Sequence, residues 1–469
     1  MSEVNQVNTH GDDVAIYVEP KKRMPLVVII MASLLGSLIL GYGMSTAMVS
    51  VTTELNGAAL AAWLFTAGNI VQMVMNPLLP SMNAKIPMPT LLLIGLLVGT
   101  ATTAGIMLAQ SMMVIIICRA IAGFSGAVIF AGGLAFAGQI MPPEKRPIVT
   151  GLQMAFNGIG SMAAPVIAGA CVDAGNWRLW VGIALALFVI VTILYIIFYP
   201  RGVKTVAGEK ADGVGVALLT ILFVALAFLL QLSGTYWPWA SPTTFALAVV
   251  CIVSLVLFVK VELKVERSGR RPAFRVTLFK VRPFLIATLC AMLACIVTNG
   301  VATYAPSYGQ TVLGLSATQS ALGYSVGSTL VIILSLFHGF FFGKKRWFKE
   351  CNTISMLVFA VVSLLLIVTG TSLSFVAFTL LIALFAAVTA WGSSVNFVIG
   401  QVMVPTEDVL DSTAGITAMQ TTGAFLGVAL NSALINLTGY NGLFTVCVVC
   451  ALACLVIMLF LKDPQKQAK

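Results

Sequence analysis

The chain has 469 residues, of which 59% are hydrophobic and only 9% are charged, and its mean hydropathy is +1.03. Soluble domains carry about 25% charged residues, so this composition excludes a water-soluble protein and indicates a chain whose solvent is lipid. The formal net charge of +10 does not indicate nucleic-acid binding, because the basic residues lie in short segments between apolar runs and form no basic stripe.

The expected membrane helices follow a polar tail, residues 1–25. A membrane-spanning helix takes about 20 predominantly apolar residues. The first apolar run is too long for a signal peptide, so we expect it to be retained. We predict an all-α integral membrane protein with fourteen spans, at 26–50, 58–81, 88–109, 112–140, 147–172, 179–199, 214–232, 243–261, 283–305, 318–341, 354–370, 373–403, 411–436 and 440–461.

The basic residues set the predicted topology, because lysine and arginine collect in cytoplasmic loops. With both termini cytoplasmic, the fourteen spans leave 24 of the 26 lysines and arginines on the cytoplasmic side. The other two are Arg178, in an external loop, and Arg119, inside the fourth span. We therefore predict a multi-pass protein of a bacterial-type cell membrane with both ends in the cytoplasm.

The spans divide into two halves of similar length. Residues 26–200 are expected to form an N-terminal six-helix bundle, and residues 282–461 a C-terminal six-helix bundle. Residues 201–281 hold two extra helices and a basic cytoplasmic linker, and residues 462–469 form a cytoplasmic tail. Two related six-helix halves are a common plan of secondary transporters.

Other chemistries have little support in the sequence. The chain has no G-x-x-x-x-G-K-[ST] sequence, so a nucleotide-driven pump is not expected. The cysteines Cys447, Cys450 and Cys454 are spaced like metal ligands, but they lie in a predicted span with no acid or histidine nearby. Such cysteines are small buried hydrophobes in most cases. We predict no metal site, no cofactor and no enzymatic activity.

Two patterns in the fourth and fifth spans carry a family resemblance. The fourth span contains "RAIAGFSGA", an R-x-x-x-G-x-x-G pattern formed by Arg119, Gly123 and Gly126. The fifth reads "GLQMAFNGIGSMAAPVIAGACVD" and resembles an antiporter motif through Gly151, Gly160, Pro165 and Gly169. Both patterns resemble the major facilitator superfamily. The "WLFTAG" that opens the second span, together with two extra central helices, is similar to the fourteen-helix drug:proton antiporter branch of that superfamily.

The resemblance implies a major-facilitator-type fold, with two six-helix bundles plus two extra central helices, and a role for these residues in coupling or gating. Arg119 would cost roughly 2.5–3.5 kcal/mol in a lipid-facing position, so it should face the protein interior or a cavity. Its roles remain open between anion binding, proton coupling and structural bonds to backbone carbonyls. The expected coupling or gating residues are Arg119, Gly151, Gly160, Pro165, Gly169 and Asp173.

One loop departs from the superfamily pattern. The segment after the second span reads "PSMNAKIPMPT", with Asn83 and Lys85 and no acid, where the superfamily usually carries an Asp–Arg–Gly signature. The charge pairs that this loop forms in the superfamily are therefore not expected here.

Polar and aromatic residues near the middle of the spans are candidates for substrate binding. Each could instead form a hydrogen bond between helices, which is the commoner use of such residues. The candidates are Tyr42, Asn69, Gln72, Gln153, Asn157, Asn299, Tyr304, Asn396 and Gln420.

The predicted function is secondary transport of small organic molecules, with efflux of drugs or amphipathic metabolites as the leading interpretation. Proton coupling follows from the resemblance, although none of the sixteen acidic residues falls at mid-membrane depth. Asp173, at the outer end of the fifth span, is the best-placed acid. The alternative is an uptake facilitator or exchanger for an organic anion, which the pattern of Arg119 without an acidic partner allows. We expect a monomer whose partners are substrate, protons and the lipid bilayer, with no nucleic acid.

Overall fold

The computed structural model describes residues 18–83, 85–142, 145–200, 203, 213–234, 236–268, 275–345, 348–402 and 409–460. Some side chains within the helices are not described, including those of residues 332–345 and 389–402. The described chain is almost entirely helical, and a helix occupies each of the fourteen predicted spans.

The helices before residue 200 are α1 (Pro20–Glu54), α2 (Trp63–Asn83), α3 (Met88–Met107), α4 (Met112–Ala127), α5 (Gly133–Ile140), α6 (Arg146–Asp173) and α7 (Arg178–Ile197). Two further helices follow, α8 (Gly213–Leu232) and α9 (Pro242–Arg267). The remaining helices are α10 (Arg282–Thr311), α11 (Ala317–Lys345), α12 (Phe348–Thr369), α13 (Phe375–Val402), α14 (Val409–Thr438) and α15 (Tyr440–Leu459). Short 3-10 turns cover Ala58–Leu60, Val276–Lys280 and Gly370–Ser372.

Twelve helical segments of the described chain are long and apolar enough to cross a membrane. Helices α11 and α13 occupy the other two predicted spans, and part of each has no described side chains. The all-α membrane architecture is thus confirmed, whereas the number of fourteen crossings stays a prediction.

The predicted fourth span is one rod with an irregular turn. Helix α4 continues into α5 through a π-helical turn, η2, at Val128–Gly132. A π turn adds a residue to the helical repeat and disturbs the regular ladder of backbone hydrogen bonds. The Gln153 side chain of α6 donates a long bond to the Phe130 carbonyl within this turn, at 3.4 Å.

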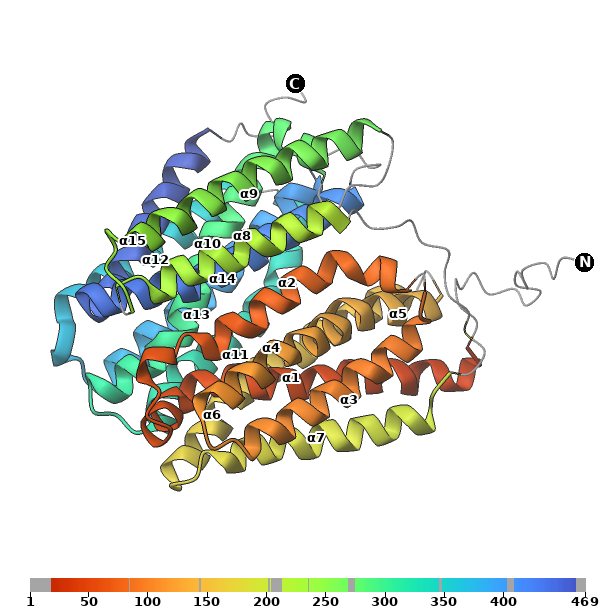
Figure 1. The fold of residues 1–469 in the computed structure, drawn as a ribbon, viewed down its shortest axis with the longest axis horizontal. Helices are drawn as coiled ribbons and strands as arrows, with labels where there is room; N and C mark the ends of the chain where they lie inside the picture. Colours follow the sequence, from red (N-terminus) through yellow and green to blue (C-terminus); the bar gives the residue numbers. More distant parts are fainter. Residues whose placement is uncertain are drawn as a thin grey trace, which may run out of the picture.

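Helices α1 to α7 pack mainly among themselves, as do α10 to α15. In the first group α1 lies against α6 and α7, and α4 lies against α2 and α3; in the second, α10 lies against α13, α14 and α15. Contacts between the groups run from α6 to α11, from α1 to α10 and from α2 to α14. In Figure 1 the helices of the two groups converge toward the left and spread apart toward the right.

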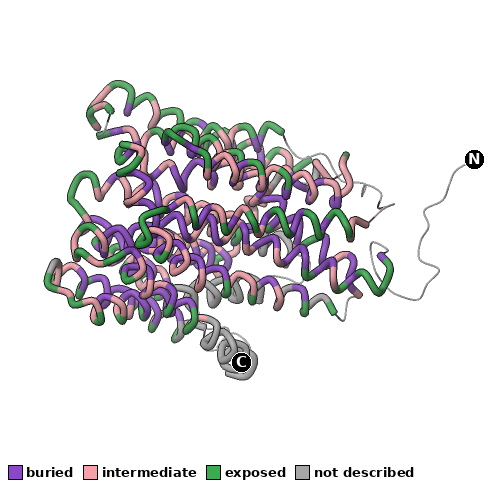
Figure 2. The backbone as a smooth tube through the Cα atoms, turned by 90° about the horizontal axis from the view of Figure 1, so that it is seen from below, coloured by how far each residue is buried: buried purple, intermediate pink, exposed green. Residues whose placement is uncertain are grey.

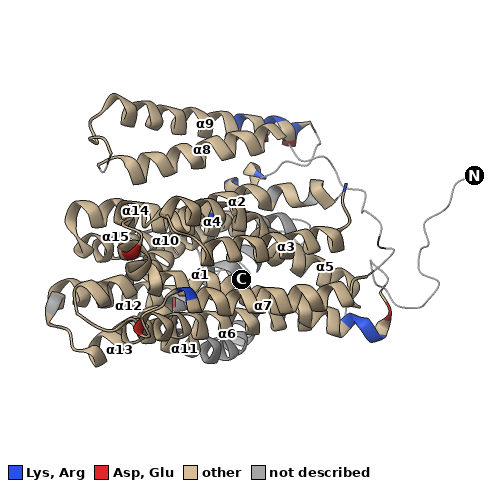
Figure 3. Cartoon of the chain, turned by 60° about the horizontal axis from the view of Figure 1, so that its bottom comes forward, with Lys and Arg blue, Asp and Glu red and all other residues tan. Residues whose placement is uncertain are grey.

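Helices α8 and α9 form a hairpin on the outside of this assembly. Helix α8 contacts both α2 and α14, so it touches both groups, whereas α9 packs mainly on α8 (Figure 3). Two aromatic pairs hold α8: Trp63 with Phe228 at 5.4 Å between ring centroids, and Phe223 with Phe425 at 5.5 Å. The Gln231 side chain also donates to the Thr66 hydroxyl at 2.6 Å.

The outer surface of the bundle is apolar, as a lipid-facing surface must be. Large hydrophobic side chains such as Ile117, Ile193 and Val249 are more than half exposed. Buried residues face one another inside the bundle (Figure 2). Charged residues gather near helix ends, and the long bodies of the helices are nearly free of them (Figure 3).

Candidate functional site

The start of α11 is bonded to the end of α6, across the boundary between the two helix groups. The Asp173 carboxylate accepts hydrogen bonds from the backbone N–H groups of Ala317, at 2.9 Å, and Thr318, at 3.0 Å. It also accepts a bond from the Ser316 hydroxyl at 3.0 Å. A helix N-terminus presents N–H groups with no partner inside the helix and carries partial positive charge, so a carboxylate is a favourable partner there.

Helix α11 is also capped by its own chain. Ser316 and Gln319 form a capping box, in which the Gln319 N–H donates to the Ser316 hydroxyl at 3.2 Å and the Ser316 N–H donates to the Gln319 side-chain oxygen at 3.1 Å. Asp173 therefore accepts hydrogen bonds from the first two N–H groups of α11, and the third N–H group, that of Gln319, is bonded to Ser316. The capping box lies within this segment alone, so it stays formed when the contact with Asp173 separates.

The backbone after Asp173 turns the chain away from α6. Gly175 has a φ of +83°, the left-handed region in which glycine is favoured. Its N–H donates to the Val172 carbonyl at 2.9 Å, and the Asn176 N–H donates to the Cys171 carbonyl at 3.1 Å. The helix thus ends at a fixed residue, and Asp173 lies at its tip, beside α11.

Glycines let α6 approach its neighbours closely. A Cβ atom on Gly169 would lie 2.7 Å from the Cα atom of Thr318, and one on Gly160 would lie 2.7 Å from the Cβ atom of Leu38. Neither distance is tolerated, so only glycine allows these contacts. Pro165 is buried inside α6 between the two glycines. Gly151 is helical, and its surroundings lie outside the described residues.

Tyr42 of α1 also contacts the second group, through Tyr324 of α11. Their ring centroids are 6.1 Å apart with an interplanar angle of 35°. Both residues are half-buried. We refer to the end of the bundle where α1 and α6 end and α2 and α11 begin as the closed end.

A second set of polar contacts at the closed end lies within the first helix group, α1 to α7. The Glu54 carboxylate accepts a bond from the Trp177 indole N–H at 2.6 Å and pairs with Arg178. Arg178 also donates to the Ala109 carbonyl at 2.9 Å. The arginine that the sequence places in an external loop is therefore neutralised by an acid at the end of α1.

Arg119 lies on the seam between α2 and α4. Its Nε donates to the Leu64 carbonyl of α2 at 2.7 Å, and the residue is half-buried. The two helices are close here, because a Cβ atom on Gly68 would lie 2.9 Å from the Arg119 carbonyl oxygen and one on Gly123 would overlap the Gly68 carbonyl. No acidic residue within the described part of the chain forms an ion pair with Arg119.

The other candidates for substrate binding fall into two groups. Three bond to main-chain carbonyls: Gln153 to Phe130, Asn299 to Cys295 at 3.0 Å and Tyr304 to Val428 at 3.2 Å. Four are half-buried and make no side-chain hydrogen bond to the described residues: Asn69, Gln72, Asn157 and Gln420. The side chain of Asn396, on α13, lies outside the described residues.

A groove of about 270 Å³ lies between α2, α4 and α8. Its lining is apolar and includes Trp63, Ile116, Ala120 and Phe228. None of the candidate residues named from the sequence lines this groove. Its lining also contains none of the residues that form the polar contacts at the closed end.

Sequence reasoning identified Asp173 and Gly169 but missed their partners on α11. The sequence "SATQ" at 316–319 is a capping-box pattern and could have predicted that a helix begins there. The sequence could not tell that this start lies beside α6, because 143 positions separate Asp173 from Ser316.

The comparisons with known proteins agree with this architecture. The Major Facilitator Superfamily profile matches residues 28–409. The chain is 25% identical over 324 residues to Multidrug transporter protein MdtP of Bacillus subtilis (strain 168), covering 68% of this chain and 58% of that protein. It is 26% identical over 329 residues to MFS-type efflux pump MFS1 of Arthroderma benhamiae, covering 67% and 60%. The matches thus span about three fifths of these relatives.

Solved structures share the fold at low sequence identity. The POT family transporter PepTSo has a TM-score of 0.69 at 13% identity, with 94% of this chain and 98% of that chain covered. A peptide transporter POT bearing an E310Q substitution has a TM-score of 0.68 at 14% identity, with 92% of each chain covered. At this identity the likeness concerns the fold alone.

The glycines of the fourth span provide a matched test of the α2–α4 seam. We expect Gly123→Ala to destabilise the protein by about 1–3 kcal/mol, because the added methyl group overlaps α2 beside the Arg119–Leu64 bond. Gly126→Ala should be nearly neutral, because its Cβ atom would lie 3.7 Å from the Gln72 side chain. Thermal unfolding of both purified variants measures the difference, and equal unfolding temperatures would contradict this account of the seam.

Proposed function

Because the chain belongs to the Major Facilitator Superfamily, we propose that it is a secondary transporter that exports small organic molecules across a membrane. The matched relatives are named multidrug transporter and efflux pump, which supports efflux of drugs or amphipathic metabolites. The observation that carries the proposal is the hydrogen-bonded contact between the two helix groups at the closed end, formed by Asp173 and the start of α11.

This contact suits alternating access, in which two bundles rock about a substrate site between them. The groups touch through polar bonds and glycine contacts at the closed end, and their helices diverge toward the other end (Figure 1). We propose that residues 26–200 and 282–461 are the two moving units. Residues 201–281 would connect them, with 1–25 and 462–469 as tails.

Gating is assigned to α6 and the fourth span. Gly160, Pro165 and Gly169 allow α6 to bend and to pack closely, and Asp173 holds the closed end through a contact that can separate. Gly151 and Arg119 complete the proposed set. The Arg119 bond to Leu64 leaves most of its guanidinium donors for a substrate or a moving partner.

Substrate binding is proposed for the polar and aromatic residues near the middle of the helices. The strongest members are the half-buried side chains that have no hydrogen-bond partner among the described residues, since their donors and acceptors are available to a ligand. The proposed set is Tyr42, Asn69, Gln72, Gln153, Asn157, Asn299, Tyr304, Asn396 and Gln420.

Proton coupling is proposed through Asp173, because an ionised carboxylate accepts the three bonds at α11 and a protonated one accepts them less well. The other charged residues described at this end, Glu54 and Arg178, are paired with each other. The alternative is facilitated transport or exchange of an organic anion. Arg119 favours that alternative, since within the described residues its charge has no acidic partner.

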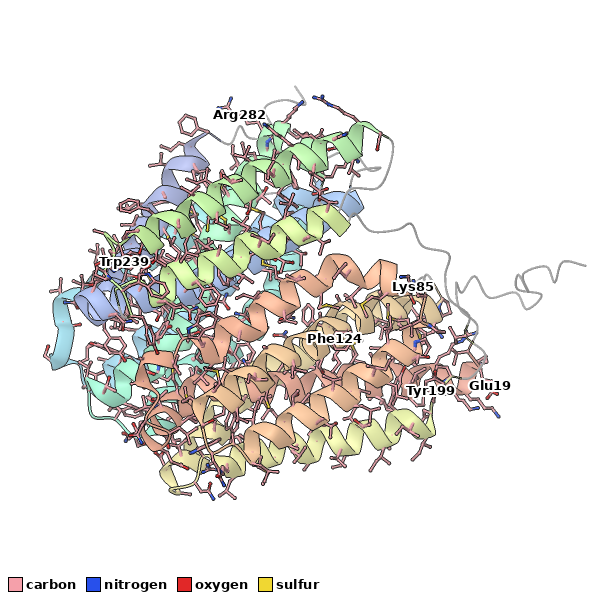
Figure 4. The ribbon with its side chains drawn as sticks, viewed as in Figure 1. Glu19, Lys85, Phe124, Tyr199, Trp239 and Arg282 are labelled. Atoms are coloured by element: carbon pink, nitrogen blue, oxygen red, sulfur yellow. The ribbon has the colours of Figure 1, made fainter. Side chains whose placement is uncertain are left out.

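We propose that the protein is a monomer of a bacterial-type cell membrane, with the closed end external and both termini cytoplasmic. In Figure 4, Glu19, Lys85 and Tyr199 lie together at one end of the first group, and Trp239 lies at the opposite side of the bundle. The position of Lys85 at that end agrees with the rule that basic loops stay in the cytoplasm.

Arg119→Ala is expected to abolish flux of a transported drug in liposomes while the protein remains inserted and folded. Arg119→Lys should rescue flux only in part, because lysine keeps the charge but lacks the planar five-donor fork of arginine. Flux is measured with the purified variants, and their insertion and thermal unfolding are checked in parallel. Normal flux in Arg119→Ala would exclude a functional role for this residue.

Asp173→Asn is expected to reduce accumulation driven by an imposed pH gradient by about tenfold or more, because the amide cannot bind and release the proton that the proposed coupling requires. The measurement is substrate accumulation in liposomes of wild type and variant at matched protein content. Three acids lie near helix ends: Glu54 at the end of α1, Asp173 at the end of α6 and Asp411 in the first turn of α14. Gradient-driven accumulation that survives neutralising all three together would contradict a proton site among these carboxylates. The absence of any gradient effect in the wild type would favour the facilitator.

Single-cysteine labelling tests the orientation. Ala240 and Lys85 are both exposed and lie on opposite sides of the predicted topology. In intact cells, a membrane-impermeant maleimide should label Ala240→Cys and leave Lys85→Cys unlabelled until the cells are opened. Labelling of Lys85→Cys in intact cells would reverse the proposed orientation.

A further inference from the structure

A second hydrogen-bonded contact joins the two helix groups at the closed end, and it contains no charge. The Gln310 side chain of α10 donates from Nε2 to the Thr46 carbonyl of α1 at 2.9 Å. Thr46 is fully buried. This bond therefore joins the first and second helix groups inside the membrane-spanning part of the protein.

Gln310 is held on the side of the second group. Its Nε2 also donates to the Ser320 hydroxyl of α11 at 3.2 Å, and Ser320 in turn donates to the Ala317 carbonyl at 2.8 Å. Helices α10 and α11 are close at this level, because a Cβ atom on Gly309 would lie 2.8 Å from the Cβ atom of Ser320. The amide is thus fixed by its own group and reaches across to α1.

The two contacts form one connected network. Asp173 bonds to the N–H of Ala317, Ser320 bonds to the carbonyl of the same residue, and Gln310 continues from Ser320 to Thr46. The network therefore links α6, α11, α10 and α1 at one end of the bundle. Its two outer bonds, at Asp173 and at Thr46, are the ones that cross between the groups.

A bond that crosses between rigid groups has a different effect from a bond inside either group. A bond within one group survives a rocking motion and contributes to folding alone. The Gln310–Thr46 bond must break when the closed end opens, so its free energy enters the equilibrium between the closed and open states. Its donor is an amide that does not titrate, so its strength is independent of pH.

We propose that Gln310 is a gating residue that holds the closed end shut as an uncharged counterpart of Asp173. Gln310 acts through the backbone of α1, so it positions the two groups and does not touch substrate. The proposal rests on the proposed alternating-access function and adds to it a residue outside the fifth-span motif. In this proposal, Gln310 provides the part of the closed-end contact whose strength does not depend on protonation.

The test measures the opening of the closed end in the full-length protein in lipid nanodiscs. Spin labels are attached at two exposed closed-end positions on opposite groups, Leu179 and Val376, in a background without other reactive cysteines. Pulsed electron–electron double resonance then gives the distribution of distances between the two spin labels. Gln310→Leu removes both donated bonds at similar side-chain volume, and Gln110→Leu makes the same change at an exposed closed-end glutamine.

We expect Gln310→Leu to raise the ratio of open to closed molecules by about fivefold, which corresponds to about 1 kcal/mol at 25 °C. Gln110→Leu should leave the distribution at its wild-type value. An unchanged distribution in folded Gln310→Leu, or an equal change in both variants, would overturn the proposal. If Gln310→Leu does not insert, Ser320→Ala, which removes the side chain that anchors Gln310, must shift the distribution in the same direction.

The distance measurement separates this proposal from the proposed function. An unchanged distribution in Gln310→Leu, with normal flux in the wild type, rejects the role of Gln310 and leaves transport standing. A wild type that carries none of a panel of drugs and organic acids in liposomes rejects the proposed transport, whatever the labels report.

Discussion

Backbone N–H and C=O groups have no water to bind inside a bilayer, so each must find its partner within the protein. This constraint explains why the described chain is built of helices, whose first N–H groups have no partner within the helix itself. At the start of α11 the N–H groups of Ala317 and Thr318 are satisfied by Asp173, from the other helix group. The groups are therefore joined at N–H groups that have no partner inside their own helix.

Lipid also removes the hydrophobic force that would hold helices together in water. Close packing and hydrogen bonds remain, and the chain uses both where its helices meet. Gly123 brings α4 against α2, and Gly169 brings α6 against α11. The first seam lies within one group and the second lies between groups, so similar chemistry serves a permanent contact and a separable one.

The two arginines outside the predicted cytoplasmic segments are accommodated in different ways. Arg178 lies at the closed end and pairs with Glu54, which neutralises it near the membrane surface. Arg119 lies deeper and bonds a main-chain carbonyl, which provides an acceptor but no opposite charge. Within the described residues this positive charge has no acidic partner, which is the electrostatic basis of the proposed alternative, transport of an organic anion. The segment after α2 carries no Asp–Arg–Gly signature, and the hydrogen bonds from Asp173 and Gln310 join the groups at the other end of the protein.

The sequence by itself determined the helical membrane architecture, because the length and apolarity of each run specify a helix whose solvent is lipid. It also identified Arg119 as a charge within an apolar run, Gly169 through the resemblance to the antiporter motif, and Asp173 as an acid at the outer end of the same span. Only the tertiary structure decided what these residues touch. The partners of Asp173 are 143 to 145 positions away, and Gln310 bonds a backbone carbonyl 264 positions away. Every residue has a backbone carbonyl, so the sequence does not indicate which carbonyl accepts the Gln310 bond. That depends on how α1 and α10 pack.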